Sequence, residues 1–314
     1  MRDIVGYYEL KALIECNISM TLQCFSYEEK QIENVPRLTS QICNSVFWKY
    51  PFYKHWAELM KFDYHILQSR LWEYVFIVQA LFENECLKQG SKGLGFGVGT
   101  EPLSALFAYL DCEIIASDLG VETKMVRQWF ARNQHPATDV NNLNLNGICP
   151  KDKFLKNVSY RTVNMNDIPC DLKGFDFCWS CSAVEHLGGK EKSFTHILKS
   201  LETLKPGGLL VFTTDYNLTS DVETDENPYC YLFTQRDLTR LTNELVSMGH
   251  YVYPLDLSEG QLLTDKFVDI YPYIGKIQLR KVRKKYLGTP VGIIVRKNKE
   301  SPQSSGALSP LFTN

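Results

Sequence analysis

The sequence comprises 314 residues, 44% of them hydrophobic, which is enough to bury a full core in one large domain or in one domain with an appendage. The formal net charge is -2, so the composition carries no electrostatic footprint for nucleic acid, and no nucleic-acid partner is expected. The chain has neither an apolar leader segment nor a long unbroken apolar run, so we expect a cytoplasmic protein without a membrane span.

The ten cysteines lack the paired spacing of a secreted disulfide framework. Cys178 and Cys181 form the only C-x-x-C, and they lie in an apolar segment that reads as a strand and its exit. No second C-x-x-C completes a zinc set. We therefore expect reduced, structural thiols and no metal centre.

Residues 1–70 are rich in aromatic side chains and are punctuated by Pro36 and Pro51, which predicts short helices and loops. Apolar residues at helical spacing then predict a helix from Ser69 to about Lys88 that ends near Gly90. We interpret 1–70 as a helical N-terminal extension that packs against a main domain or caps its substrate.

From residue 91 the chain alternates between strand and helix patterns. Strands are predicted over 92–96, 113–117, 158–163, 175–180, 209–214 and 291–296, the last one antiparallel at the far side of the sheet. Helices are predicted over 101–110, 121–133, 193–204 and 234–248, and Thr234 with Asp237 predicts a capping box on the last helix. The alternation predicts an α/β fold with a doubly wound parallel sheet over 71–298, followed by a loose tail over 299–314.

The most informative segment is the glycine-rich turn that runs from Lys92 to Pro102. Glycine lets the backbone turn sharply and approach a ligand closely. Asp118 ends the next predicted strand, where a carboxylate can accept the hydroxyl groups of a ribose. Together the turn and the acid predict a nucleoside cofactor at the carboxyl edge of the sheet.

Five segments, in the order that the family has them, resemble class I S-adenosylmethionine-dependent methyltransferases over roughly residues 70–297. They are Gly93–Thr100, Ser117–Asp118, Asn164–Pro169, Phe175–His186 and Leu204–Phe212. The Leu-Lys-Pro-Gly-Gly turn in the last segment fits this family far better than a nicotinamide dehydrogenase. The resemblance implies a Rossmann-like, mostly parallel, seven-stranded sheet and S-adenosyl-L-methionine as the cofactor.

The resemblance also implies which residues bind this cofactor. Asp118 would accept the ribose hydroxyls and Asp167 the adenine amino group, although Asp118 as a helix cap and Asp167 as a turn residue are the structural alternatives. The full set of implied cofactor positions is Gly95, Phe96, Gly97, Gly99, Thr100, Glu101, Asp118, Leu119, Asn166, Asp167, Ile168, Ser180 and Cys181. The family often has an acid just before the first glycines, and it is missing here. Glu101 is the candidate that pairs with the cofactor's ammonium instead.

His186 follows the fourth strand at the ligand-binding edge, and because its side chain titrates near neutrality it is the best general-base candidate. Glu185 is the alternate base, and the alternative for His186 is a role in the pocket wall. Metal-dependent relatives have Glu-x-x-Glu-His here, but Ser182 replaces the first Glu, so no metal is expected.

Four blocks resemble a bacterial-type branch often associated with cell-surface glycan assembly: Ser69–Tyr74, Gly97–Leu103, Asp265–Asp269 and Gly288–Lys297. This branch implies O-methylation of a sugar hydroxyl or a related small hydroxylated acceptor. Two alternatives stay open. One is an N-methyltransferase whose acidic loop 221–226 attracts an amine, and the other is a catalytically silent methyltransferase-like binding protein. The basic run 280–285 is interpreted as solvated surface.

Overall fold

The computed structural model describes residues 32, 34–120, 139–225, 227, 229–270 and 275–299. Its strands are β1 (Ser40–Ile42), β2 (Leu67–Gln68), β3 (Lys92–Phe96), β4 (Glu113–Asp118), β5 (Val158–Thr162), β6 (Phe175–Cys181), β7 (Leu204–Asn217), β8 (Tyr251–Val252), β9 (Leu255–Asp256), β10 (Ile277–Gln278), β11 (Lys281–Arg283) and β12 (Tyr286–Arg296). Its helices are η1 (Ser45–Lys49), α2 (Pro51–Leu59), α3 (Ser69–Glu83), α4 (Leu103–Tyr109), η2 (Val140–Asn144), α6 (Lys151–Asn157), η3 (Val184–His186), α7 (Lys190–Thr203), α8 (Gln235–Ser247) and α9 (Leu263–Lys266).

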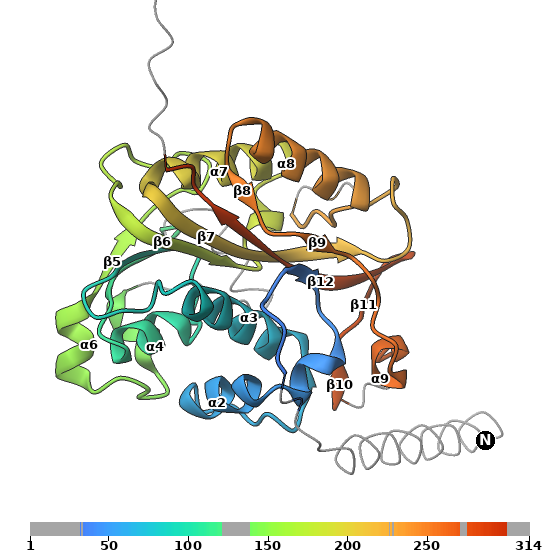
Figure 1. The fold of residues 1–314 in the computed structure, drawn as a ribbon, viewed down its shortest axis with the longest axis horizontal. Coiled ribbons are helices and arrows are strands. Elements are labelled where there is room, and N and C mark those ends of the chain that lie inside the picture. The colour runs from blue at the N-terminus through green and yellow to red at the C-terminus, as the bar shows by residue number, and fades with distance from the viewer. Residues whose placement is uncertain are drawn as a thin grey trace, which may run out of the picture.

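Ten of these strands form one sheet, with the order β5-β4-β3-β6-β7-β12-β1-β9 and with β8 and β11 paired to β12. The five strands from β5 to β7 are mutually parallel, whereas β12 runs antiparallel to β7. Helices α2, α3 and α4 cover one face of the sheet, and α7 and α8 cover the other (Figure 1). The predicted doubly wound, mostly parallel α/β fold is therefore confirmed.

The order of the parallel strands reverses at β3. The chain leaves β3 toward β4 and β5 on one side, and then crosses back to place β6 on the other side. In open α/β sheets, ligands bind in the crevice outside the carboxyl ends of the two strands that flank such a reversal. Here these ends are Phe96 of β3 and Cys181 of β6.

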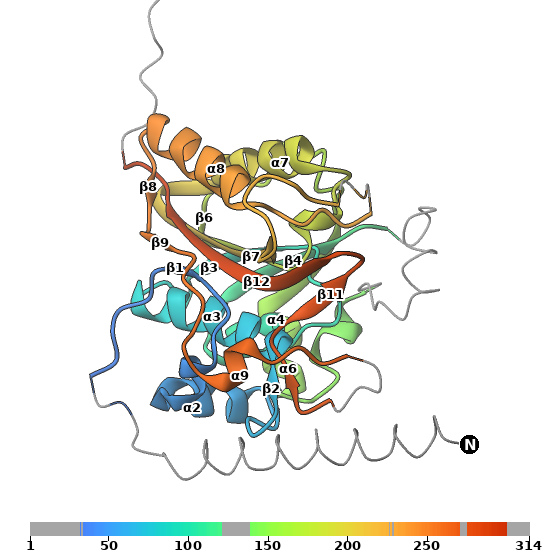
Figure 2. The ribbon, with the colours of Figure 1, turned by 90° about the vertical axis from the view of Figure 1, so that its right-hand side faces the viewer.

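The sheet has ten strands rather than the seven expected, because several two- and three-residue strands extend it beyond β7. One of them, β1, comes from the segment that the sequence predicts as a helical extension, and it lies between β12 and β9. Figure 2 shows β1 and β9 beside β12 at this side of the sheet. The predicted antiparallel strand 291–296 is the second half of β12, which begins earlier, at Tyr286.

The aromatic residues of the N-terminal segment pack mainly inside the protein. Phe47 and Trp72 are fully buried in the core between the sheet and helices α2 to α4. Trp56 is also buried there, and its indole donates a 2.7 Å hydrogen bond to Gln79 of α3. Burial of such large apolar rings is a main source of folding stability. Trp56 and Trp72 thus form core rather than a platform for a sugar.

Helix α3 differs from its prediction at its C-terminus. It ends at Glu83, because Asn84 turns its side chain back to the carbonyl of Ala80 and Glu85 takes a positive φ of 58°. Gly90 therefore lies beyond the helix and does not end it. The helix predicted over 121–133 lies outside the described residues, as do residues 300–314 of the predicted tail.

The start of α8 follows its prediction. The Thr234 hydroxyl accepts a hydrogen bond from the backbone N–H of Asp237, and the Asp237 carboxylate accepts one from the backbone N–H of Thr234. This is the predicted capping box, which satisfies two backbone donors that have no partner within the helix. Over the described part of the chain, no helix is long and apolar enough to cross a membrane.

Candidate functional site

The glycine turn after β3 forms one wall of the crevice. Gly97 and Gly99 have φ values of 60° and 52°, in the left-handed region that favours glycine. A Cβ on Gly97 would lie 2.7 Å from the Cβ of Ala183 and 3.1 Å from the sulfur of Met165. The turn therefore lies close to both the exit of β6 and the loop after β5.

Gly95 and Phe96 contribute to packing in the protein core. A Cβ on Gly95 would collide with the indole of Trp179, so this glycine lets β3 and the buried Trp179 ring pack together. The Phe96 side chain is fully buried and lies edge-to-face on His196, with ring centroids 5.0 Å apart. The Phe96 side chain is therefore part of the core. Of the predicted cofactor-binding position Phe96, only the backbone remains a candidate for contact with the cofactor.

Asp118 at the end of β4 is bonded to the glycine turn. One carboxylate oxygen accepts a 2.9 Å hydrogen bond from the N–H of Gly99, and the other accepts a 2.7 Å bond from the N–H of Leu119. The side chain is 5% exposed. The carboxylate is thus held beside the glycine turn. The alternative role, capping of the predicted helix 121–133, falls outside the described residues.

The Asn166–Asp167 loop follows β5 at the carboxyl edge of the sheet. Asn164 accepts from the backbone N–H groups of both Asp167 and Asn166, at 2.8 Å and 3.0 Å, through its carbonyl and its side chain respectively. Asp167 is exposed, and Ile168 packs against the core beneath. The segment is a tight turn whose polar side chains lie at the ligand edge, so the turn role and a cofactor role are compatible.

Glu101, just after the glycine turn, is a buried carboxyl group. It is 6% exposed, accepts a 2.6 Å hydrogen bond from the Trp179 indole and forms no ion pair with any described residue. Burial raises its pKa to about 8, and the Trp179 bond and the positive charge of Arg70 only partly oppose this. Thr100 beside it is exposed. A carboxyl group in this state requires either a proton or a cationic ligand.

Replacement of Glu101 by Gln is expected to stabilise the free protein at alkaline pH. Because the folded pKa of about 8 exceeds the ordinary value of 4.5, the stability that the proton supplies below pH 4.5 is lost as the pH rises toward 8. Gln keeps the acceptor for Trp179 and removes a loss on the order of 4 kcal/mol. Thermal unfolding should show a Tm several degrees higher for E101Q at pH 8.5 and a much smaller difference at pH 5.

The exposed Glu113 at the start of β4 provides the matched control, since E113Q removes the same charge from a solvated site. The Tm of E113Q should follow that of the wild type at both pH values. An unchanged Tm for E101Q at pH 8.5 would show that Glu101 does not carry an unpaired charge in the folded protein.

A buried network joins the exit of β6 to helix α3. Glu73 of α3 is fully buried and accepts hydrogen bonds from the hydroxyls of Ser182 and, at 3.1 Å, Thr213. Arg70, one turn earlier, forms a 3.2 Å ion pair with Glu73 and donates a 3.7 Å bond to the Cys181 sulfur. The hydroxyl of Ser180, another implied cofactor position, has no partner among the described residues.

Neither Arg70 nor Glu73 is predicted from the sequence as a residue of the candidate site. One signal was present, because Glu73 stands between Trp72 and Tyr74 in an otherwise apolar helix face, and an acid there must find partners. Their partners lie more than 100 positions away along the chain, so their identity was not readable from the local pattern.

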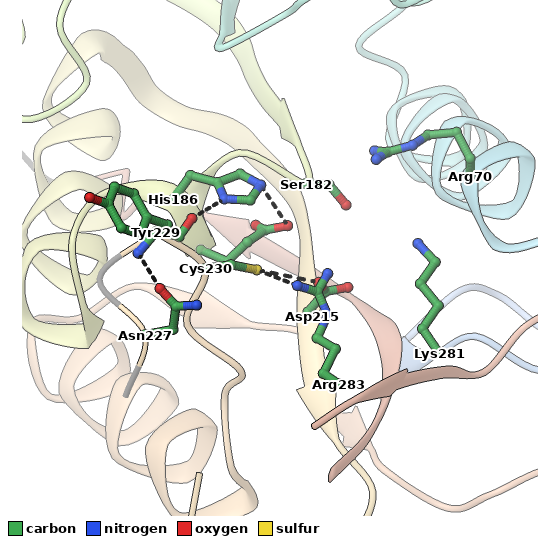
Figure 3. A pocket seen from close by; sticks show the side chains of 10 residues that line it. Arg70, Ser182, His186, Asp215, Asn227, Tyr229, Cys230, Lys281 and Arg283 are labelled. Atoms are coloured by element: carbon green, nitrogen blue, oxygen red, sulfur yellow. Dashed lines mark hydrogen bonds and ion pairs between the residues drawn. The ribbon is translucent and has the colours of Figure 1, made fainter. Parts of the chain in front are cut away.

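A cavity of about 250 Å³ opens beyond Ser182, at the ends of β6 and β7 (Figure 3). It is lined almost entirely by polar and charged side chains, contributed by α3, the exit of β6, β7, the following loop and β11. The lining residues are Arg70, Ser182, Glu185, His186, Asp215, Asn227, Tyr229, Cys230, Lys281 and Arg283.

His186 and Glu185 both line this cavity. Nδ1 of His186 lies 2.6 Å from the carbonyl oxygen of Tyr229, so this nitrogen carries the proton and Nε2 is the acceptor in the neutral ring. Nε2 lies 4.0 Å from one oxygen of Glu185, whose other oxygen accepts a 3.1 Å bond from Thr214. Burial raises the pKa of Glu185 to about 7, and the nearby His186 opposes this rise. The structure therefore brings both predicted base candidates together.

Asp215 of β7 carries a charge that is matched within the cavity. It forms an ion pair with Arg283, which also donates a 2.7 Å bond to the Cys230 sulfur. Burial alone would raise the pKa of Asp215, but Arg283 and Lys281 together hold that pKa below its ordinary value. Burial also raises the pKa of the Cys230 thiol to about 12, so this thiol is neutral.

The acidic loop and the basic run that the sequence singled out meet in two surface ion pairs. The interpretation of 280–285 as solvated surface is wrong for its inner half, because Arg280 is buried and Lys281 and Arg283 line the cavity. Lys284 forms a 2.7 Å ion pair with Asp225, and Lys285 lies 3.7 Å from Glu223. Among the described residues, no group of three His, Cys, Asp or Glu side chains could hold a metal ion. Glu223 and Asp225 of the loop are thus engaged by lysines outside the cavity.

No protein-family profile matches the chain, and no curated protein matches it. Among solved structures, a methyltransferase from Methanosarcina mazei described as S-adenosylmethionine-dependent is 15% identical, with a TM-score of 0.41 over 70% of this chain and 98% of that one. Magnesium protoporphyrin IX methyltransferase from Synechocystis, with bound S-adenosylhomocysteine, is 10% identical, with a TM-score of 0.43 over 73% and 86%. An S-adenosylmethionine-dependent methyltransferase from Clostridium acetobutylicum is 12% identical, with a TM-score of 0.37 over 78% and 92%.

Proposed function

We propose that this chain is an S-adenosylmethionine-dependent methyltransferase that methylates a hydroxyl group on a small acceptor. The observation that carries the proposal is the bond between Asp118 and the Gly97–Gly99 turn at the point where the strand order reverses. A polar cavity with a His–Glu pair opens beside that point. This arrangement supports a nucleoside site and an acceptor site that would meet at Ser182.

The residues of the crevice fit this cofactor. The sulfonium centre and the zwitterionic tail need close backbone rather than phosphate-neutralising cations, and the left-handed glycine turn offers such backbone. Asp118 is placed to accept the ribose hydroxyls, and the Asn166–Asp167 loop lies where adenine would be held. Glu101, buried without an ion pair among the described residues, suits the ammonium group.

S-adenosylmethionine, held by the glycine turn, Asp118 and Glu101, would supply an electrophilic methyl group, and its sulfur would keep the electron pair of the broken carbon–sulfur bond. The protein's own task is to align the acceptor and to remove the hydroxyl proton. Nε2 of His186 takes this proton, because Nδ1 is already committed to the Tyr229 carbonyl. Glu185, 4.0 Å away, then stabilises the imidazolium. The pair thus forms a base and a residue that positions and stabilises it.

The structure also bears on the alternatives. An amine acceptor needs only to be neutral, so a dedicated proton acceptor favours a hydroxyl. The acids at 223 and 225, which could have attracted an amine, form ion pairs with lysines instead. Sugar derivatives are the proposed acceptors because they carry several hydroxyl groups, and a cavity of about 250 Å³ lined by polar side chains suits one such unit.

The proposal is tested first by calorimetry with S-adenosylmethionine, where absence of binding to the wild type would overturn it. Release of S-adenosylhomocysteine is then measured with a panel of sugars, sugar acids, sugar phosphates and amines. With the acceptor that gives turnover, H186A and E185Q should lower the rate by about 100-fold or more, with unchanged cofactor affinity. E191Q, at an exposed acid paired with Arg240, is the control and should retain full activity. An undiminished rate in H186A would remove His186 as the base.

A further inference from the structure

The cavity holds more positive charge than its own acids balance. Arg70, Lys281 and Arg283 reach it from two elements far apart in the sequence, α3 and β11 (Figure 3). Its carboxylates are Glu185 and Asp215. Whether the cavity can bind an anion depends on which of these charges already form ion pairs within the protein.

Two of the three cations have partners. Arg283 is paired with Asp215, and Arg70 is paired with Glu73 behind the cavity wall. Glu185, whose pKa burial raises to about 7, is bonded to Thr214 and faces the ring of His186. Asp215 is influenced by the charges of both Arg283 and Lys281, but its ion pair is with Arg283, so no acid of the cavity forms an ion pair with Lys281.

Lys281 forms no ion pair or hydrogen bond with any residue that the structure describes, although it is only half-exposed. Strand alternation in β11 directs Lys281 and Arg283 to the cavity side, and it directs the intervening Val282, which is 55% exposed, to the solvent. Lys284, just past the strand, turns outward to Asp225. The basic run thus divides into an inner and an outer set.

The neighbouring Arg280 is a further buried cation, but it is not among the residues that line the cavity. Its guanidinium is 2% exposed and is held by the Cys43 carbonyl at 2.8 Å and the Thr289 hydroxyl at 2.6 Å, with no ion pair to a described residue. A partly desolvated cation without an ion-pair partner is costly, and an anion that enters the cavity would relieve that cost at Lys281.

We infer that the acceptor carries an oxyanion, a carboxylate or a phosphate, which binds Lys281 while the reacting hydroxyl lies toward His186. This inference rests on the proposed function and deepens it by naming the acceptor class, such as a sugar acid or a sugar phosphate. The lysine ammonium on its long, flexible side chain acts as a point charge, so it can bind either a carboxylate or a phosphate. Small neutral sugars lack the group that Lys281 selects.

The test reads Lys281 directly and needs neither cofactor nor turnover. Lysine side chains of the full chain are labelled by reductive ¹³C-methylation, which keeps their charge. The resonances of Lys281 and Lys284 are assigned by their loss in K281Q and K284Q. Inorganic phosphate and sodium acetate are then titrated at constant ionic strength, and the shifts of the two lysines are compared.

The expected result is a saturable shift of Lys281 with at least one anion, with a dissociation constant about tenfold or more below that of the surface-exposed Lys284. Preference for phosphate identifies a phosphoryl group on the acceptor, and preference for acetate identifies a carboxylate. If the Lys281 and Lys284 resonances respond alike to both anions, the inference is overturned.

Calorimetry with phosphate or acetate on the unlabelled protein gives a second reading. K281R, which keeps the charge, should retain the binding that K281Q loses, and K284Q should bind as the wild type does. Binding of S-adenosylmethionine is measured separately on the same proteins. If the wild type does not bind S-adenosylmethionine, the proposed function is overturned and the anion result still stands. If the Lys281 resonance does not respond to either anion, only the present inference is overturned.

Discussion

Replacement of Asp118 by Ala is expected to weaken the binding of S-adenosylmethionine by about 100-fold. Each hydrogen bond from a ribose hydroxyl to a carboxylate contributes about 1.5 kcal/mol or more, and two such bonds account for this loss. The same carboxylate accepts from the N–H of Gly99, so its removal also loosens the glycine turn. Calorimetry with the purified variant measures the change in dissociation constant.

Two further variants separate the charge from the fold. D118N keeps an acceptor for one backbone N–H but loses the charge, so a comparable loss of affinity identifies the carboxylate as the group that binds. D171A removes an exposed acid that is paired with Arg161 of β5, and it should bind the cofactor as the wild type does. Wild-type affinity in D118A would place the cofactor away from the end of β4.

Replacement of Gly292 by Ala is expected to lower the free energy of unfolding by about 3 kcal/mol. Gly292 lies in the middle of β12, where a Cβ would collide with the ring of Phe76 on α3. Phe76 is fully buried, so the helix must move away from the sheet to accept the methyl group. Urea denaturation measures the loss as a lower transition midpoint with an unchanged slope.

The cause can be checked with a double-mutant cycle. F76A destabilises by itself, but G292A should cost much less in the F76A background, because the small side chain leaves room for the methyl group. Additive effects would mean that Phe76 is not the obstacle. Since α3 also carries Arg70 and Glu73, G292A should disturb the cavity as well as the stability.

The parallel half of the fold was predictable because each of its elements has its own local pattern. Strands β3, β4 and β6 are short apolar runs, and the capping box of Thr234 and Asp237 is a four-residue signal. Strand β1 has no such signal. Its three residues pair with β12 and β9, more than 200 positions away, so only tertiary contacts make them a strand.

The same distinction applies to the site. Asp118 and the glycine turn lie about one strand and one helix apart, and their meeting follows from the geometry of a parallel sheet. The convergence of Arg70 and Lys281 on one cavity depends on how α3 and β11 pack, which no spacing encodes. Phe96 shows the opposite limit, because a residue next to the glycine-rich turn can supply core packing with its side chain.

Strand β1 has a consequence for how the protein is made. The hydroxyl of Ser40 accepts a 3.0 Å hydrogen bond from the N–H of Ile294, and Gln41 pairs with Gly292. A ribosome delivers residues 40–42 long before β12 leaves its exit tunnel, so the early strand must wait unpaired while the parallel strands form. The β12 side of the sheet is therefore completed only after β12 has emerged, and until then the early strand is open to wrong pairing with its neighbours.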